Sequence, residues 1–243
     1  MDFVLIHGGA HAGSCWERLV PHLDAPAHAL DLPGRGRRPA PLDGLGVADW
    51  VDAVVAETLA LASGPVVLVG HSLAGITLPR VAERIPERIA HLVFVSCTVP
   101  PGGQCVLDVI AAEVVALTPA AARGDALLSE AVARAMFCND MDEEETRFVL
   151  ERLVPEARRP MQEPMDLTGL RRPIPRSYVK LLRDQSVPPR DQDRMIATIG
   201  GGCRVVELDA GHDAMVSQPR ALAEILNRIR RDQLSSSTSK RAV

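Results

Sequence analysis

Three residues in this chain, Ser72, Asp184 and His212, are of the types that nucleophilic acyl transfer requires. A serine hydroxyl is a weak nucleophile until an imidazole can take its proton. The imidazole in turn needs a carboxylate on its second nitrogen, which fixes the tautomer and stabilises the imidazolium. Each of the three residues follows a stretch with the pattern of a buried strand. We therefore expect them to meet at one edge of a parallel sheet.

Ser72 stands between a predicted strand and a predicted helix, which is the setting that a nucleophile elbow requires. Val66–Val69 are four consecutive apolar residues, three of them β-branched, and residues 76–85 have helical spacing. The motif G-x-S-x-G is incomplete, because Ala74 replaces the second glycine and Gly75 comes one place later. Small residues are expected here, since the turn is strained and its backbone passes close to neighbours. The alternative is an ordinary strand-to-helix turn that happens to carry a serine.

A glycine-rich loop, residues 7–13, follows the apolar stretch Phe3–Ile6. It lacks both the G-x-x-x-x-G-K-[ST] and the G-x-G-x-x-G spacing, which argues against nucleotide binding. We predict instead that the loop supplies a backbone N–H for a developing oxyanion, a role that requires close approach and therefore glycine. The predicted donors are the N–H groups of Gly9 and Leu73. His7 and His11 are expected to shape the loop through hydrogen bonds.

Each of the three chemical residues has a simpler explanation when taken alone. His212 could be a surface or capping histidine, and Asp184 could be an Asx-turn residue before prolines. Asp209 is a rival acid, but it is so close to His212 in sequence that it would hardly reach the imidazole from a separate strand end. The histidines in predicted helices or strands are expected to be structural: His22, His28 and His91.

The bulk properties favour one large α/β domain, or a core domain plus a small insertion, without nucleic-acid or membrane partners. The chain has 243 residues, a net charge of −4 and five cysteines without metal-ligand spacing. A weak negative charge gives no attraction to nucleic acid or to an anionic membrane. No apolar run is long enough to span a bilayer, and the acidic start Met1-Asp2 is unlike a secretory signal. The odd cysteine count predicts reduced thiols and a cytoplasmic location.

Alternating strand and helix patterns predict a mainly parallel, doubly wound sheet of about six strands. The predicted strands are residues 3–6, 27–32, 66–69, 91–96, 177–182 and 203–208. Helical patterns lie between them, at residues 14–23, 47–61 and 191–199, and the last helix is expected from Pro219 to about Arg231. Residues 1–100 and 171–234 form the predicted core, and the polar, serine-rich residues 235–243 are expected to be disordered.

Residues 101–170 show no strand pattern, and an insertion of this length is too long for a plain connection. We predict a helical cap over the carboxyl edge of the sheet, with helices at residues 106–117, 124–136 and 142–153. The acidic run 140–145 is expected to begin a cap helix, where negative charge suits the helix dipole, and no metal site is predicted. Candidate pocket residues, for which ordinary packing is the alternative, are Val106, Ile110, Met136, Phe137, Phe148 and Met165.

The chain resembles the α/β-hydrolase superfamily in four segments that together span nearly its whole length: His7–Trp16, Gly70–Gly75, Asp184–Pro188 and Ala210–Met215. Within the superfamily it is similar to the small plant-type methylesterase and hydroxynitrile-lyase branch and its bacterial relatives. The cap matches only in position and helical character. The resemblance implies a helical cap over an apolar pocket, no cofactor, and hydrolysis of small carboxylic esters through an acyl-enzyme.

The resemblance also bears on other reactions. Lyase members of the branch carry a lysine directly after the catalytic histidine, where this chain has Asp213, so cyanohydrin cleavage is disfavoured. Dehalogenases and epoxide hydrolases need an aspartate at the elbow, which Ser72 excludes. A biosynthetic cyclase, a C–C bond hydrolase, a thioesterase or a non-catalytic ligand binder stay open, because a fold does not fix a function. The expected partner is a small-molecule ester, and a homodimer is left open.

Overall fold

The computed structural model describes residues 1–110 and 127–241, with residues 236–241 given by their backbone alone. In this described part, six parallel strands form one sheet in the order β2-β1-β3-β4-β5-β6. The strands are β1 (Phe3–Ile6), β2 (Ala27–Leu30), β3 (Val66–His71), β4 (Ile89–Val95), β5 (Arg176–Leu181) and β6 (Cys203–Leu208). The predicted α/β fold class is confirmed, and the described sheet is wholly parallel.

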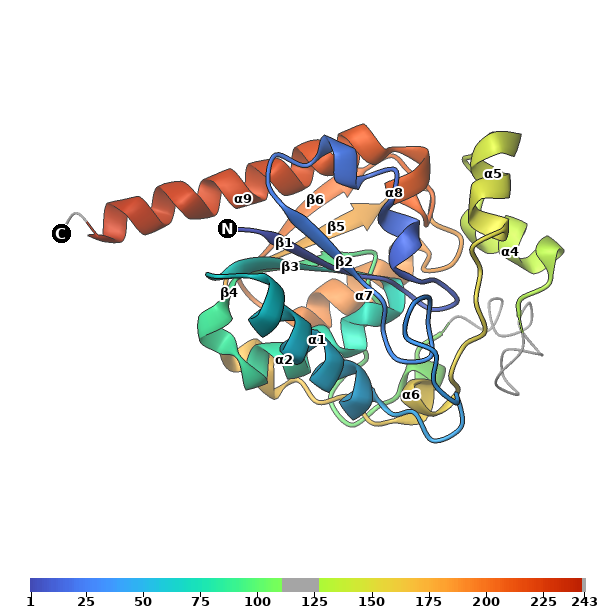
Figure 1. Ribbon diagram of the computed structural model, residues 1–243, viewed down its shortest axis with the longest axis horizontal. Helices are drawn as coiled ribbons and strands as arrows, with labels where there is room; N and C mark the ends of the chain where they lie inside the picture. Colours follow the sequence, from blue (N-terminus) through green and yellow to red (C-terminus); the bar gives the residue numbers. More distant parts are fainter. Residues whose placement is uncertain (111–126, 242–243) are drawn as a thin grey trace.

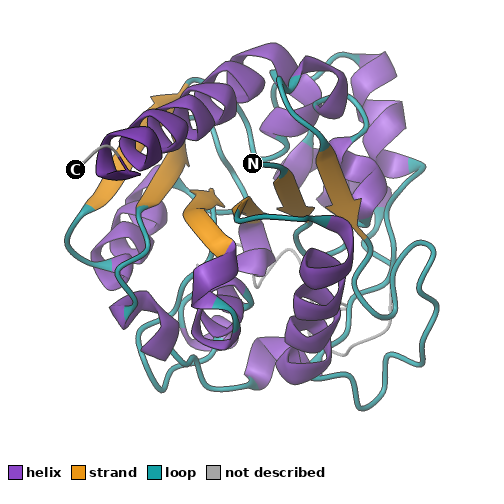
Figure 2. Cartoon of the chain, turned by 60° about the vertical axis from the view of Figure 1, so that its left-hand side comes forward, coloured by secondary structure: helices purple, strands orange, loops and turns teal. Residues whose placement is uncertain are grey.

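The central strands are apolar because helices cover both faces of the sheet. In β3, Val66 and Leu68 face one layer, and Val67 and Val69 face the other. The first layer contains α1 (Val47–Leu61), α2 (Leu78–Arg84) and α7 (Pro189–Ile199). The second contains the short α8 (Ala214–Ser217) and the long α9 (Pro219–Arg241). Figure 1 shows α1, α2 and α7 below the sheet and α9 above it, and Figure 2 shows the sheet between its helices.

The cap elements lie beyond the carboxyl ends of the strands (Figure 1). They are η5 (Val106–Asp108), α4 (Glu130–Phe137), α5 (Glu143–Leu150) and α6 (Arg159–Gln162). The last element before β5, η7 (Thr168–Arg171), packs instead against α2. The acidic run begins α5 as expected, because Asp142 is its N-cap and forms a capping box with Glu145. The predicted helices 106–117 and 124–136 fall partly outside the described residues.

Two local predictions differ from the structure. Residues 14–23 form two short 3₁₀ helices, η1 (Gly13–Trp16) and η2 (Val20–His22), rather than one α-helix. Pro21 explains this, since a proline has no N–H and disfavours the helical conformation of the residue before it.

Helix α9 differs from its predicted end near Arg231, because it continues to Arg241. Residues 235–241 are therefore helical here rather than disordered. No glycine or proline follows Pro219, so nothing in the sequence forces the helix to stop. The end of α9 projects beyond the body of the molecule (Figure 1). None of the helices in the described residues is both long and apolar enough to cross a bilayer.

His91 is a buried histidine of β4 that stays neutral in the folded protein. Its Nε2 atom lies 2.9 Å from Ser177 Oγ on β5. Burial, together with the nearby Arg204 guanidinium, lowers the pKa of His91 from 6.5 to about 4, although Asp232 acts in the opposite direction. The hydrogen bond to Ser177 agrees with the structural role expected for this histidine.

We expect His91 to make the fold sensitive to acid. As the pH falls below 6.5, the unfolded chain binds a proton at His91 that the folded protein does not bind until about pH 4. Stability is therefore lost through this window, by on the order of 3 kcal/mol. His91→Gln keeps a polar partner for Ser177 but cannot titrate. Urea unfolding at about pH 7 and about pH 4 should show a smaller loss of stability in His91→Gln than in the wild type. Equal losses would contradict this explanation.

Candidate active site

Ser72 lies in the sharp turn between β3 and the 3₁₀ helix η3 (Ser72–Ile76). Its φ of 52° is in the left-handed region, where a residue with a side chain is strained. A side chain at Gly75 would collide with the Thr98 carbonyl and come within 2.9 Å of Cys97 Cβ. Close approach of the neighbouring backbone therefore requires glycine at position 75, whereas position 74 accommodates alanine. The strand–turn–helix setting expected from the sequence is present.

Asp184 and His212 are joined by a buried hydrogen bond. His212 Nδ1 lies 2.7 Å from Asp184 Oδ2, and both residues are about 1% exposed. Among the described residues, this is the only hydrogen bond of the His212 ring, so Nε2 remains free to take a proton. Asp209, the rival acid, is exposed and pairs instead with Arg183 at 2.9 Å.

Ser96 is a partner of Asp184 that no sequence motif singles out. It follows β4 in a left-handed conformation, with φ 43°, and its hydroxyl donates to Asp184 Oδ2 at 2.6 Å. The other carboxylate oxygen accepts the N–H groups of Ser186 and Val187 at 2.7 and 2.8 Å. Asp184 therefore accepts four hydrogen bonds, which hold it in place as an acceptor for the imidazole. The only sequence signal for Ser96 was its place at the end of a predicted strand.

Two cap residues between α4 and α5 hold the loops that carry Asp184 and His212. Asn139 Nδ2 donates to the carbonyl of Arg183 at 2.9 Å. Asp140 Oδ2 accepts the Gly211 N–H at 2.6 Å and the Ser217 hydroxyl at 2.9 Å. A side chain at Gly211 would collide with Asp140, so this approach requires glycine. From the sequence alone, Asp140 is expected only to belong to the acidic start of a cap helix.

The glycine-rich loop approaches the elbow closely, as expected. A Cβ atom at Gly8 would lie 2.8 Å from Ser72 Cβ and 3.0 Å from His71 Nδ1. Gly9 and Leu73 line the same pocket as Ser72. The backbone N–H groups of Gly9 and Leu73 donate to no other described residue. Both are therefore available to an oxygen placed beside Ser72.

His7 and His11 shape this loop through hydrogen bonds, as predicted. Burial and the nearby Arg35 lower the pKa of His7 to about 3. The neutral His7 ring donates from Nδ1 to the Gly8 carbonyl at 2.9 Å, and its Nε2 accepts the Leu32 N–H at 3.3 Å. His11 Nδ1 donates to the Gly9 carbonyl at 2.7 Å.

His11 also binds Asp213, the residue that follows His212, in a buried ion pair. His11 Nε2 donates to Asp213 Oδ2 at 2.8 Å. Although burial opposes both charges, the pKa of His11 is raised by Asp213 and the pKa of Asp213 is lowered by His11. The His11 ring therefore donates from both nitrogens as an imidazolium. The pair links the glycine-rich loop to the loop that carries His212.

His71 packs against His212, with ring centroids 4.5 Å apart. Burial and His212 lower the pKa of His71 well below 6.5, so the neutral ring donates from Nε2 to the His212 carbonyl at 3.0 Å. Of the described residues, His71, His212 and Asp213 alone form a group whose ligand atoms could hold a metal ion, all within 4.8 Å of one another. His71 binds the His212 carbonyl and Asp213 binds His11. These hydrogen bonds explain why the three residues lie together without invoking a metal ion.

The pocket beside Ser72 is small and mostly apolar. Its volume is about 120 Å³, well below the several hundred Å³ of sites for drug-sized ligands. Phe137 lines it and stacks on His212 with a ring separation of 5.6 Å, so the imidazole lies directly behind a residue of the pocket wall. Four of the predicted pocket residues also line it: Val106, Ile110, Met136 and Phe137.

Phe148 and Met165 do not line this pocket, which corrects the prediction. The Phe148 ring lies instead under the guanidinium groups of Arg152 and Arg18, at 3.9 and 5.0 Å. Met165 is 5% exposed and packs in the core on the α1 and α2 side of the sheet. Helical spacing alone could not indicate which face of a cap element meets the pocket.

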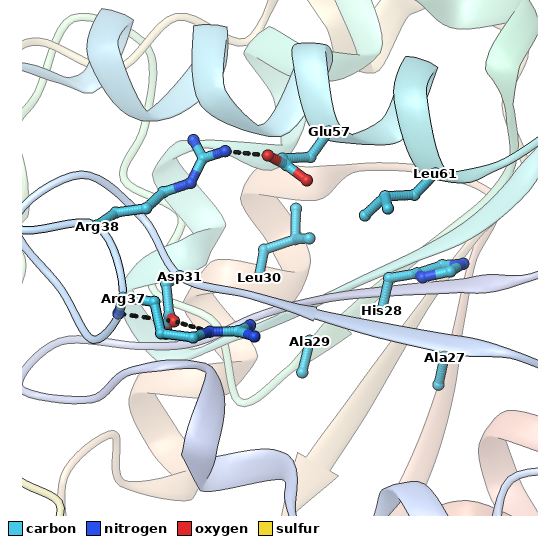
Figure 3. A pocket seen from close by; sticks show the side chains of 9 residues that line it. All are labelled: Ala27, His28, Ala29, Leu30, Asp31, Arg37, Arg38, Glu57 and Leu61. Atoms are coloured by element: carbon cyan, nitrogen blue, oxygen red, sulfur yellow. Dashed lines mark hydrogen bonds and ion pairs between the residues drawn. The ribbon is translucent and has the colours of Figure 1, made fainter.

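A second cavity, of about 520 Å³, lies along edge strand β2 and contains none of the residues discussed above as chemical candidates (Figure 3). Its charged groups are already paired with one another. Asp31 binds Arg37 at 3.1 Å, and Arg38 binds Glu57. This cavity is therefore a weaker candidate than the pocket at Ser72.

Comparison with known proteins places these features in a family context. A model of the alpha/beta hydrolase family matches residues 3–225. Pyrethroid hydrolase of Sphingobium wenxiniae is 30% identical over 93% of this chain and 86% of its own length. Methyl jasmonate esterase 1 of Vitis vinifera is 36% identical over 40% of this chain and 40% of its own. The structure of an extracellular alpha/beta-hydrolase from a Paenibacillus species covers 94% of this chain and 98% of that chain, with a TM-score of 0.83 and 24% identity.

Removing the Ser96 hydroxyl should slow the hydrolysis of a test ester without unfolding the protein. Ser96→Ala leaves Asp184 with three hydrogen bonds, and we expect kcat for p-nitrophenyl acetate to fall about tenfold, or ~1.4 kcal/mol. Ser96→Gly removes the same hydroxyl and relieves the left-handed strain, so it is the matched control. Steady-state kinetics and thermal unfolding should show the same loss of kcat in both variants. An unchanged kcat in Ser96→Gly would remove this residue from the site.

Proposed function

The chain belongs to the alpha/beta hydrolase family, and we propose that it is a serine esterase that hydrolyses small or medium carboxylic esters or lactones through an acyl-enzyme. The observation that carries this proposal is the hydrogen bond of 2.7 Å between His212 Nδ1 and Asp184 Oδ2. It lies at the same sheet edge as the strained Ser72. The two similar proteins named as a hydrolase and an esterase support it.

The first half of the reaction acylates Ser72. His212 Nε2 takes the proton of the Ser72 hydroxyl as Oγ attacks the ester carbonyl carbon. Asp184 keeps the proton on Nδ1 and stabilises the imidazolium. The N–H groups of Gly9 and Leu73 bind the oxyanion of the tetrahedral intermediate. As the intermediate collapses, the bond to the alkoxy group breaks, and the imidazolium returns its proton to the departing alcohol.

The second half releases the acid. Water enters beside the acyl group, and His212 takes one of its protons as the oxygen attacks the acyl carbon. The same two N–H groups bind the second oxyanion. Cleavage of the bond to Ser72 Oγ then regenerates the hydroxyl with the proton held on His212. No cofactor or metal enters either half.

The residue after His212 argues against cleavage of cyanohydrins. Asp213 is buried, and its pKa is lowered by the neighbouring His11. The chain therefore has no cation at the position where the lyase members of the branch carry a lysine.

The pocket volume supports a small substrate. A cavity of about 120 Å³ with mostly apolar walls fits a short acyl or alkoxy group better than a long chain. We also propose a cytoplasmic location, supported by five unpaired cysteines, of which Cys15, Cys97 and Cys138 are buried.

Ester hydrolysis should depend on Ser72. Ser72→Ala is expected to lower kcat for p-nitrophenyl acetate by on the order of 10⁶, because the nucleophile is removed. The wild type should release a burst of p-nitrophenol equal to the enzyme concentration and react with a fluorophosphonate probe. Ser14→Ala, which changes a serine outside the site, serves as the control and should retain both properties. A wild type that is inert to both reagents would favour a non-catalytic ligand binder.

Short esters should be preferred over long ones. We expect kcat/KM for p-nitrophenyl acetate or butyrate to exceed that for the dodecanoate by at least about tenfold, because the long chain cannot enter the small pocket beside Ser72. Steady-state kinetics below the micelle-forming concentration of each ester would measure this ratio. A rising kcat/KM with chain length would contradict the small-substrate assignment.

A further inference from the structure

The peptide that joins Gly9 to Ala10 is held at both ends by charged side chains. His11 donates to the Gly9 carbonyl at 2.7 Å, and the Ala10 N–H donates to Glu156 Oε2 at 2.9 Å. Ala10 is left-handed, with φ 59°, a conformation that a residue with a side chain keeps only when its surroundings impose it. Glycine at position 9 can adopt many backbone dihedral angles and so does not fix the peptide by itself. The orientation of this peptide must therefore come from its partners.

The partner on the N–H side comes from the cap. Glu156 lies between α5 and α6, is 8% exposed, and lines the pocket beside Ser72. Two residues earlier, the Val154 N–H donates to the Ala10 carbonyl at 2.9 Å. The cap segment 154–156 therefore holds Ala10 by both its N–H and its carbonyl.

The second carboxylate oxygen of Glu156 is also occupied. Oε1 accepts the Ala157 N–H at 2.8 Å and forms an ion pair with Arg35. Arg35 comes from the loop after β2, is 2% exposed, and lies over the Trp50 ring at 5.7 Å. Its Nη1 also donates to the His11 carbonyl at 3.4 Å. Glu156 and Arg35 thus form a pair in which each residue also binds the backbone of the glycine-rich loop.

A buried carboxylate in a mostly apolar pocket calls for an explanation, because burying a charge is costly unless it is paired. Arg35 supplies a partner for this charge, but an apolar side chain at position 156 would fill the same space and would need no charged partner. The bond to Ala10 gives the carboxylate a role that an apolar residue could not perform.

We propose that Glu156 is a positioning residue for the oxyanion site. By fixing the Gly9–Ala10 peptide from the cap, it limits rotation at Gly9 and so restrains the preceding Gly8–Gly9 peptide, whose N–H is the predicted oxyanion donor. This inference rests on the proposed esterase function. Glu156 acts through the loop rather than on the substrate. Its loss therefore affects the charged tetrahedral state more than the binding of a neutral ester.

Glu163 provides a matched control in the same part of the cap. It too accepts a core backbone N–H, that of Val47 at 3.3 Å, and pairs with Arg159 at 3.3 Å and Arg80 at 3.8 Å. It does not line the pocket beside Ser72. A variant at this position reports the general effect of loosening the cap.

The test replaces the charged pair by apolar residues of similar volume, as Arg35→Met with Glu156→Leu in one chain, since such exchanges often preserve stability. Glu156→Ala is the second variant, and Glu163→Leu is the control. The readouts are kcat and KM for p-nitrophenyl acetate, inhibition by n-butylboronic acid, and the thermal midpoint. Boronic acids form a tetrahedral anionic adduct with serine, so their binding reports the oxyanion site.

We expect both Glu156 variants to lose roughly 10- to 100-fold in kcat, with KM within about threefold of the wild type. The boronic acid should bind weaker by a similar factor. The Glu163→Leu control should change kcat and boronic acid inhibition by less than about twofold. A folded double variant with wild-type kcat and wild-type inhibition would overturn the inference, as would an equal loss in the control.

Failure of the proposed function would be recognisable separately. If the wild type and Ser72→Ala hydrolyse the ester at the same rate, the esterase proposal and the oxyanion role of Glu156 both fall. If Ser72→Ala is inactive and the Glu156 variants keep the wild-type kcat, only the positioning role falls. Hydrogen exchange at the Ala10 amide measures the holding bond itself, and exchange as slow in Glu156→Ala as in the wild type would also refute it.

Discussion

Asp184 accepts four hydrogen bonds, from His212, Ser96 and two backbone N–H groups, and the place of the imidazole depends on this one carboxylate. A partly satisfied buried carboxylate would be free to rotate or to bind water. With every direction occupied, it offers His212 a single position. The rings of His71 and Phe137 also pack against the imidazole, with centroids 4.5 and 5.6 Å away. In the proposed reaction, the imidazole that takes the proton of Ser72 is thus held in place before any substrate arrives.

The cap takes part in this rigidity as well as enclosing the pocket. Three of its residues hold three different loops: Asn139 binds the loop of Asp184, Asp140 binds the loop of His212, and Glu156 binds the glycine-rich loop. Loops at the carboxyl edge of a parallel sheet are joined to it only at their ends. The hydrogen bonds from the cap hold the middle of each loop in place, which the strands cannot do.

The sequence was sufficient for the sheet and for the contact between Asp184 and His212. Ser72, Asp184 and His212 each follow an apolar stretch, and parallel topology brings such positions together whatever their separation along the chain. Ser96, Asp140 and Glu156 could not be found this way. Their partners are 88, 71 and 146 residues distant, and no local pattern distinguishes them from solvated polar residues. Phe148 and Met165 were misplaced for a related reason, since a short apolar period indicates a buried face but not what covers it.

The three loop attachments of the cap all lie within residues 139–156, a segment that also borders the pocket through Glu156. One short segment thus contributes to the wall of the pocket and also holds the loops that carry the chemical groups. Such coupling limits how the protein can diversify. A cap grafted from a relative with another specificity would bring its own set of loop attachments, so recombination at the cap boundaries would exchange selectivity and reactivity as one inherited unit.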